Sequence, residues 1–342
     1  MTNRATGAQP ASGRLLCTSR TKAELAKRTP IVLTDRDKGI LTAIHTHGLL
    51  TTELIELAFF PEPSDGRRSP CSRAYERLQQ LWRWGYAERV ELPVARSLGG
   101  RSPYLYALAR RGEPVVAQRL GPGAGRAQRR RLDRLSSVFV DHDLKIAAFW
   151  ANLVALLRST RAGLGRWLPE RELRAGKVRV QDPRTGWWLP VLPDAAFEVV
   201  YPDGFVQGCL LEVDMGTLTL KRFRRKLRAF ELYLAQGLAA KHWEHDFEVL
   251  VLTHSRPRLQ QLWRVARDEV PPERWGAYSF GTFDLLEPRR FREACWVTAG
   301  NELVPLLYDD AFPAAATEPT AAPAEADHET ADAAPARAVG TS

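Results

Sequence analysis

The stretch VLPDAAFEVVYPDGFVQGCLLEVD (residues 191–214) decides the fold of the second half of this chain. Two runs rich in aliphatic residues flank the turn sequence Tyr-Pro-Asp-Gly at 201–204, a pattern typical of an antiparallel hairpin. A turn centred on residue 203 places position 194 opposite position 212, so we expect Asp194 and Glu212 to lie close together. A register shift of one residue would separate them.

The acidic residues of this hairpin form a candidate metal site. Asp214 lies two residues beyond Glu212 and therefore on the same face of the strand. Carboxylates that converge repel one another and favour a hard cation such as Mg²⁺. We therefore treat Asp194, Glu212 and Asp214 as candidate metal ligands and candidate catalytic residues.

The segments around the hairpin predict a mixed α/β domain. In chain order we expect a helix over 139–158, an extended segment over 167–173, the hairpin, a helix over 218–236, a strand over 247–255, a helix over 256–270 and a strand region over 275–286. Glu170 and Glu172 fall in the extended segment. They could complete the acidic site, although exposed strand residues are the simpler interpretation.

The helix expected over 218–236 is amphipathic. Its inward stripe contains Leu220, Phe223, Leu227, Phe230 and Leu234. Its other face is basic and contains Lys221, Arg222, Arg224, Arg225 and Arg228. We consider Arg222 and Arg225 candidate phosphate contacts, with an ordinary solvated surface as the alternative.

The N-terminal half predicts three helices followed by a hairpin. Thr34 and Asp37 have capping-box spacing before a helix that ends near Gly48, and Thr51 can cap a second helix that stops at the prolines after residue 60. A third helix is expected over 69–84, followed by strands over 86–94 and 102–109. This order indicates a winged helix-turn-helix domain, and the whole chain is expected to be α+β.

Basic residues on the third helix and on the wing indicate DNA binding. Arg73, Arg77 and Gln80 recur at i, i+4 and i+7, so one helical face carries all three. Arg96 and Arg101 lie in the expected hairpin tip, which in a winged helix approaches the DNA backbone. The alternative is a solvated face of a protein-binding module.

The charge of the chain also favours a nucleic-acid partner. Its formal net charge is +9, although residues 311–342 hold five acids against one base. The stretch LGPGAGRAQRRRLDR (120–134) indicates a linker whose Arg129, Arg130 and Arg131 are further candidate phosphate contacts. We expect an unstructured segment over 1–30, the winged helix over 31–120, a basic linker over 121–134, the α/β domain over 135–308 and an unstructured acidic Ala/Pro-rich tail over 309–342.

Other features of the sequence favour a cytoplasmic protein. No run approaches the roughly 20 apolar residues of a membrane helix, and the first thirty residues lack the apolar block of a secretory signal. The four cysteines are far apart and form no CxxC pair, so reduced thiols are expected and neither a disulfide framework nor a zinc site is predicted.

The motifs of the second half carry a resemblance to known families. Pro193-Asp194, the LEVD segment (211–214) and the following basic helix resemble the core of the PD-(D/E)xK nuclease-like fold. Together with a winged helix, a His-Asp-Leu helix (142–144), an L-E-x-D-x-G-T segment (211–217) and an R-x-K-L helix, they resemble the replication-relaxation family over about residues 31–290.

The nuclease resemblance implies specific roles for these residues. Asp194 and Glu212 match the metal-binding acids, whereas Asp214 stands where active nucleases carry a lysine. Lys226 or Lys221 on the next helix could supply a migrated lysine. His142 is more simply explained as a helix cap or a hydrogen-bond partner.

Three functions therefore follow as expectations. The first is a protein that binds double-stranded DNA in plasmid or mobile-element replication or mobilisation, without catalysis, for which a homodimer is one candidate state. The second is a Mg²⁺-dependent nuclease that nicks DNA. The third is an adaptor that binds a relaxase or a replication initiator.

Overall fold

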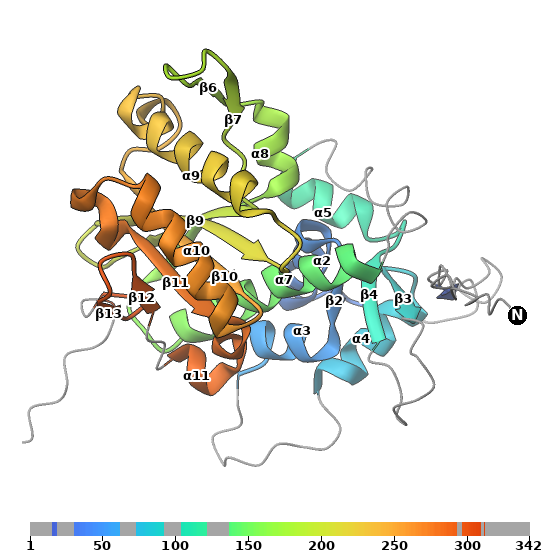
Figure 1. Ribbon diagram of the computed structural model, residues 1–342. Coiled ribbons are helices and arrows are strands. Elements are labelled where there is room, and N and C mark those ends of the chain that lie inside the picture. Colours follow the sequence, from blue (N-terminus) through green and yellow to red (C-terminus); the bar gives the residue numbers. More distant parts are fainter. Residues whose placement is uncertain are drawn as a thin grey trace, which may run out of the picture.

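The structure, a computed structural model, describes residues 16–18, 31–61, 73–91, 104–121, 137–292, 296–308 and 311 (Figure 1). The fold is a mixed α+β arrangement with a small sheet in the N-terminal part and a seven-stranded mixed sheet in the C-terminal part. Helices pack on both faces of the large sheet, and the two parts lie against each other.

The N-terminal part contains three helices, a small antiparallel sheet and a fourth helix. Its elements are α2 (Asp35–His47), β2 (Leu50–Thr51), α3 (Thr52–Phe59), α4 (Arg73–Arg83), β3 (Ala87–Glu91), β4 (Tyr104–Leu108) and α5 (Glu113–Leu120). The strand β2 precedes α3 and pairs with β4, which in turn pairs with β3. The expected order of three helices and two antiparallel strands is confirmed, whereas α5 was not predicted.

Side-chain caps define the first two helices, as the sequence predicts. The Thr34 hydroxyl accepts a hydrogen bond from the Asp37 amide, and the Asp37 carboxylate accepts one from the Thr34 amide, which completes a capping box. Gly48 ends α2 with a φ of +83°, a conformation that glycine adopts without steric cost. The Thr51 hydroxyl caps α3 through the Leu54 amide.

One strand lies inside the segment that was expected to be unstructured. β1 (Leu16–Thr18) pairs antiparallel with β3, with Leu16 opposite Glu91. The prediction for residues 1–30 is therefore wrong at these three positions. β1 pairs with backbone donors and acceptors that would otherwise be exposed at the edge of β3.

The C-terminal part is built around the seven-stranded sheet, whose strand order is β13-β12-β11-β10-β9-β8-β5. Its helices are α7 (Ser137–Leu157), α8 (Glu170–Gly176), α9 (Leu220–Ala235), α10 (Arg256–Glu269) and α11 (Pro288–Arg292). Its strands are β5 (Gly163–Pro169), β8 (Ala195–Val200), β9 (Val206–Asp214), β10 (Phe247–Thr253), β11 (Tyr278–Thr282), β12 (Trp296–Thr298) and β13 (Leu303–Val304). A separate hairpin pairs β6 (Arg179–Gln181) with β7 (Trp188–Pro190).

The register of the central hairpin agrees with the sequence prediction. Ala195 pairs with Leu211, so residues 194 and 212 face each other just beyond the last pair of β8. The turn closes with Gly204 at a φ of +91°, and its amide bonds to the Tyr201 carbonyl. This turn fixes the register, because a residue with a side chain rarely adopts that conformation.

The sheet separates two apolar layers. Alternate residues of β9 point to opposite faces, so Leu210 packs with α9 and α10 whereas Leu211 packs with α7 and α11. Glu212 and Asp214 share the face of Leu210 and therefore point toward α9 and α10. β9 and β10 run parallel, which brings their carboxyl ends to one edge of the sheet.

Three local predictions for this part need correction. The extended segment over 167–173 ends at Pro169, and α8 follows, so Glu170 and Glu172 are helical rather than strand residues. Leu220 is 37% exposed instead of inward, because α9 begins at that residue. Ala311, assigned to the tail, is buried, and its carbonyl accepts a hydrogen bond from the Arg161 amide.

Helix α7 joins the two parts of the molecule. Ala147, Trp150 and Ala151 belong to the N-terminal core, whereas Phe149 and Leu153 belong to the core beneath the large sheet. An apolar helix can serve two cores in this way because its residues point in all directions around the axis. No helix in the described ranges is long and apolar enough to cross a membrane.

Candidate functional site

A surface hollow of about 590 Å³ opens at the carboxyl end of β9. Asp194 and Glu212 lie in it beside Lys226 of α9 and His142 of α7, and α8 forms a further wall. The hairpin register brings the two acids together, and the two helices supply the basic side chains. The structure thus places Lys226 beside Asp194 and Glu212. Lys226 is one of the two residues that the sequence offers as a migrated lysine.

Glu212 is buried, and only one of its two carboxylate oxygens has a hydrogen-bond partner. Its Oε2 atom lies 2.5 Å from the Lys226 Nζ atom, whereas its Oε1 atom is buried without a hydrogen-bond partner. Burial raises the pKa of Glu212 to about 8, although the charge of Lys226 opposes that shift. A buried carboxylate oxygen without a donor is costly, so it marks a position where a cation could bind.

Asp194 is held from three sides. Its Oδ2 atom accepts a hydrogen bond of 2.8 Å from the Val213 amide and lies 3.3 Å from Nε2 of His142. Its Oδ1 atom lies 3.8 Å from the Lys226 Nζ atom. Burial alone would raise the pKa of Asp194, but Lys226, His142 and the Val213 amide together lower it. Asp194 is therefore a carboxylate at neutral pH.

His142 is more than the helix cap that its sequence position suggests. It contacts the carboxylates of Asp194 and Asp143, and these contacts raise its pKa to about 10 although burial acts in the opposite direction. The imidazole is therefore protonated at neutral pH. Two positive groups, Lys226 and His142, thus flank Asp194. The sequence carries this signal only in the His-Asp-Leu triplet.

Asp214 does not join the other two acids, in contrast to the prediction. The Arg258 guanidinium on α10 binds it, with Nε at 2.7 Å from Oδ2 and Nη2 at 3.3 Å from Oδ1. Thr253 donates a further hydrogen bond of 3.0 Å to Oδ2. Asp214 lines the hollow, but protein donors already occupy both of its oxygens.

The residues present fit a metal ion at Asp194 and Glu212, because Glu212 retains a buried oxygen without a donor. They do not form the expected three-carboxylate cluster. Over the described residues, no group of three or more His, Cys, Asp or Glu side chains is arranged to hold a metal ion. Any cation at this site would draw its remaining ligands from backbone, water or substrate.

Helix α9 carries further basic side chains besides Lys226, outside the lining of the hollow. Arg222 lies one turn before Lys226, and both Arg222 and Arg225 are exposed without an ion pair to any described residue. Arg224 instead pairs with Asp268, and Arg228 is half-buried against Asp182. The two candidate phosphate contacts on this helix are therefore free to meet a ligand.

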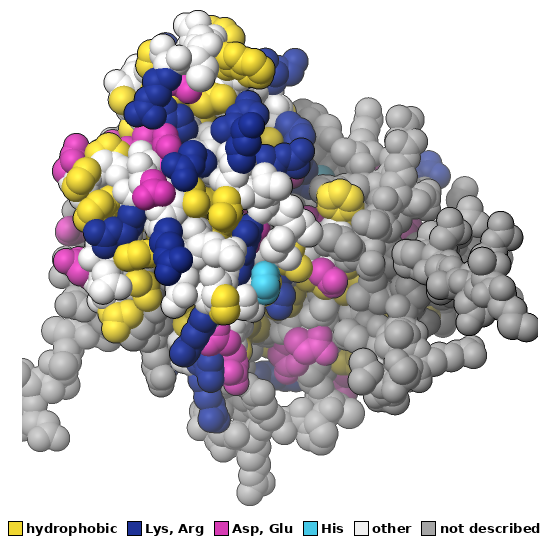
Figure 2. Space-filling model, in the orientation of Figure 1, with side chains coloured by type: hydrophobic (Ala, Val, Ile, Leu, Met, Phe, Trp, Pro, Cys, Tyr) yellow, Lys and Arg dark blue, Asp and Glu magenta, His cyan; other side chains and the backbone are white. Residues whose placement is uncertain are grey.

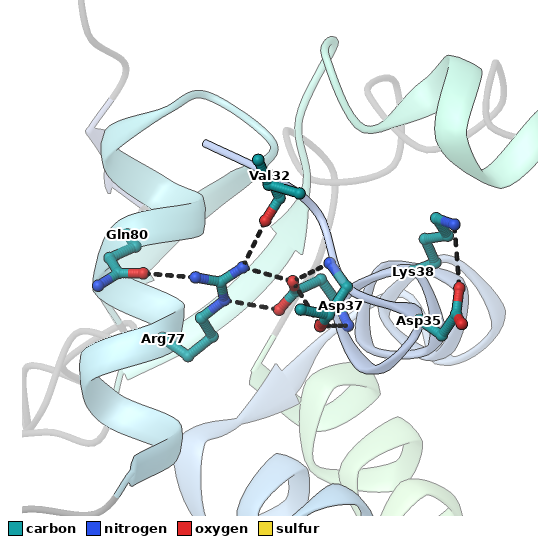
Figure 3. Close-up of polar contacts among 7 residues, drawn as sticks. Val32, Asp35, Asp37, Lys38, Arg77 and Gln80 are labelled. Carbon is teal, nitrogen blue, oxygen red and sulfur yellow. Dashed lines mark hydrogen bonds and ion pairs between the residues drawn. The ribbon is translucent and has the colours of Figure 1, made fainter. Parts of the chain in front are cut away.

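On the third helix, one candidate reader of DNA is engaged inside the protein. Arg77 points from α4 to the start of α2, where its Nε and Nη2 atoms lie 2.7 and 2.5 Å from the Asp37 carboxylate (Figure 3). Nη2 also donates to the Val32 carbonyl, and Nη1 donates to Oε1 of Gln80. Arg77 therefore fastens α4 to α2, and its donors are not free for DNA.

The residues that α4 exposes differ from the predicted set, because Arg77 is half-buried whereas Glu76 and Arg83 are exposed. Its exposed residues are Arg73, Glu76, Gln80 and Arg83. Arg73 donates one hydrogen bond to the Pro61 carbonyl, and Arg83 forms no ion pair with any described residue. Arg83 was not predicted, although its distance of ten residues from Arg73 continues the same helical face. A hollow of about 510 Å³ lies between α4 and the start of α2.

The other candidate DNA contacts lie outside the described residues. These are Arg96 and Arg101 of the expected wing and Arg129, Arg130 and Arg131 of the expected linker. They remain predictions from the sequence.

Comparison with known proteins gives one match. The family model described as replication-relaxation matches residues 41–245. The chain belongs to the replication-relaxation family. The match begins within α2 and ends before β10, so it covers α4 and the four side chains His142, Asp194, Glu212 and Lys226. No curated protein and no solved structure matches the sequence.

Membership in the replication-relaxation family suggests a role in replication or mobilisation. Arg258 lies beyond the matched residues. The ion pair that neutralises Asp214 therefore comes from a part of this chain that the family model does not describe.

Proposed function

We propose that this replication-relaxation protein binds double-stranded DNA through its N-terminal part and acts in plasmid or mobile-element replication or mobilisation. The arrangement of the small sheet carries the proposal. The pairing of β2 with β4, together with the three helices and the β3–β4 hairpin, resembles the connectivity of a winged helix and supports the proposal. In that fold the third helix enters the major groove, and here it is α4.

The exposed residues of α4 suit this role. Arg73 and Arg83 can contact phosphates or guanine edges, and the NH₂ group of Gln80 remains able to donate after its Oε1 atom has accepted from Arg77. Arg77 contributes indirectly, since it fixes the angle between α4 and α2. The net charge of +9 would add the salt-dependent attraction that is typical of DNA-binding proteins.

A duplex-binding assay at several salt concentrations tests this proposal. We expect the Arg73→Ala/Arg83→Ala variant to lose about tenfold in affinity and to reduce the salt slope by about 2, since each lost phosphate contact lowers it by about 1. The matched control is Lys241→Ala/Arg264→Ala, which removes two exposed charges from the C-terminal part. Full affinity of the α4 variant would contradict the assigned helix and would favour an adaptor role.

A second candidate function is metal-dependent cleavage of DNA at the hollow. The specific observation in its favour is the unpartnered Glu212 Oε1 atom beside Asp194 and Lys226. The order α7, β5, β8, β9, α9, β10 also resembles the core of the PD-(D/E)xK nuclease fold. Lys226 would then replace the lysine that is missing at position 214.

In this candidate function the protein groups have distinct tasks. Asp194 and Glu212 would hold the metal ion, which when bound would supply positive charge to a phosphate oxygen. Glu212 and Asp194 raise the pKa of Lys226, so it keeps its positive charge. Lys226 would polarise the attacking water. His142 would orient Asp194 through the contact at Nε2. Arg222 and Arg225, exposed on the same helix as Lys226, would attract the phosphate backbone.

Thermal unfolding with MgCl₂ or with EDTA tests this second candidate without relying on activity. We expect Mg²⁺ to raise the Tm of the native protein, because a ligand that binds only the folded state stabilises it. The Asp194→Asn and Glu212→Gln variants should lose this response. An equal response in all three proteins would place Mg²⁺ elsewhere and contradict the candidate.

A further inference from the structure

The β6–β7 hairpin is a feature that neither the duplex-binding helix nor the acidic hollow uses. It forms a sheet of its own and lies beyond α8 and α9 at one end of the molecule (Figure 1). Val180 and Leu189 point inward and are buried in the core beside α9. They anchor the hairpin, so its outer face is held in a defined position.

Two tryptophans of the hairpin are exposed to solvent. Trp188 is 59% exposed and lies opposite Gln181, and Trp187 precedes it with 67% exposure. The other eight tryptophans of the chain are buried or half-buried. Two adjacent exposed indoles are unusual on a protein surface, because each leaves a large apolar area in water, and they indicate a binding surface.

Two positive side chains lie at the start of the same hairpin. Arg179 shares the outer face of the hairpin, and Lys177 precedes it; both are exposed and form no ion pair with any described residue. Figure 2 shows basic side chains next to hydrophobic ones at the end of the molecule where β6 and β7 lie. An aromatic surface bordered by unpaired cations is complementary to a ligand with flat rings and negative charge.

We propose that the β6–β7 hairpin binds single-stranded DNA. Unpaired bases would stack on Trp187 and Trp188, and Lys177 and Arg179 would contact the adjacent phosphates. Duplex DNA does not fit this surface, since its bases are already stacked and paired. A membrane or an apolar peptide would need a wider apolar area than two indoles.

The position of the hairpin connects it with the hollow. Helix α8 lines the hollow with Arg171 and Arg174 and leads directly to Lys177 and β6. A strand that is separated from its complement near the hollow would therefore meet basic side chains along α8 before it reaches the tryptophans. The hairpin would hold such a strand whether or not the hollow cleaves DNA.

Fluorescence anisotropy with two probes tests the proposal. One probe is a labelled oligothymidylate of about 20 nucleotides, which spans the footprint of a typical single-strand site. The other is a duplex of equal length. We expect the Trp187→Ala/Trp188→Ala variant to lose at least about tenfold in affinity for oligothymidylate, because stacking on one ring is worth that much. Its affinity for the duplex should not change.

Three further variants make the result specific. Trp187→Phe/Trp188→Phe retains flat rings and should keep most of the affinity. Phe205→Ala removes an exposed ring from the β8–β9 turn and should have no effect. Arg179→Gln should weaken binding and reduce its dependence on salt, and it tests the proposal even if the double alanine variant does not fold.

Unchanged oligothymidylate affinity in the folded double alanine variant would overturn the proposal, and so would unchanged affinity and salt dependence in Arg179→Gln. Loss of binding to anionic vesicles with unchanged oligothymidylate affinity would identify a membrane surface instead. The duplex proposal is tested independently of this one, because the Arg73→Ala/Arg83→Ala variant should lose duplex affinity and retain oligothymidylate affinity.

Discussion

The two parts of the molecule each contain a buried carboxylate paired with a basic side chain from a neighbouring helix. In the N-terminal part, both oxygens of Asp37 accept hydrogen bonds from Arg77, and Oδ2 also accepts from Thr34. In the C-terminal part, Glu212 bonds to Lys226 through Oε2 alone, and Oε1 is left without a donor. The two acids are almost equally buried, at 1% and 3% exposure.

The difference separates a structural ion pair from a candidate site. Burial would raise the pKa of Asp37, but Arg77 and Thr34 lower it overall, whereas burial raises the pKa of Glu212 to about 8. A satisfied pair holds two helices together. An ion pair in which one buried oxygen lacks a hydrogen-bond donor lowers the stability of the fold, and such a cost is typical of residues that are selected for function.

The largest expected effect is the loss of the satisfied pair. Arg77→Ala leaves Asp37 buried and without its main partner, so we expect the free energy of unfolding to fall by about 3 kcal/mol. Urea unfolding followed by circular dichroism measures this change. The matched control is Arg83→Ala on the same helix, which is exposed and should change stability by less than about 0.5 kcal/mol. Equal stability of the two variants would show that the Asp37 pair is not structural.

The response to pH should also distinguish the two pairs. The His142 pKa is raised to about 10, so its contribution to stability is complete below pH 6.5 and is lost as the pH rises through 10. The pKa of Glu212 is raised to about 8, so its contribution to stability also falls as the pH rises from 4.5 to 8. The Arg77 pKa is raised as well, so the N-terminal pair does not titrate in this range.

We therefore expect the native protein to lose about 2 kcal/mol of stability between pH 7 and pH 10, a value reduced for the partial exposure of His142. The His142→Gln variant should show a smaller loss over the same interval. Unfolding free energies at four or five pH values measure both slopes. Parallel curves for the two proteins would contradict the assigned contacts of His142.

The smallest expected effect is that of neutralising the acid of each pair, and it should differ in size between the two parts. Burial raises the pKa of Glu212 to about 8, so at neutral pH Glu212→Gln replaces a largely protonated acid with a neutral amide of similar shape, and stability should change by less than about 1 kcal/mol. Asp37→Asn replaces one of two accepting oxygens with an NH₂ donor and removes the charge that faces Arg77, so it should destabilise by about 2 kcal/mol. Thermal unfolding of both variants tests the comparison. A larger loss for Glu212→Gln would reverse it.

Local signals predicted much of this structure from the sequence. The Thr34 capping box and the turn at Gly204 are set by neighbouring residues, and the turn in turn sets the approach of Asp194 to Glu212. These features need no information about distant segments.

Contacts between distant segments could not be predicted in the same way. The helical spacing of Arg77 identifies its face but not its partner Asp37, which lies 40 residues earlier. The partner of Asp214 is Arg258, 44 residues later on another helix. The short edge strands β12 and β13 carry too few residues for a recognisable pattern.

Duplex binding is the central claim, and incubation with supercoiled plasmid tests it most directly. Purified protein is mixed with the plasmid in Mg²⁺ or in EDTA, and bound, nicked and intact forms are resolved on one gel. We predict retarded plasmid in both conditions at low salt, with weaker retardation by Arg73→Ala/Arg83→Ala. Nicking that requires Mg²⁺ and disappears in Glu212→Gln would add the second function. Plasmid that migrates unchanged in both conditions would contradict the proposal.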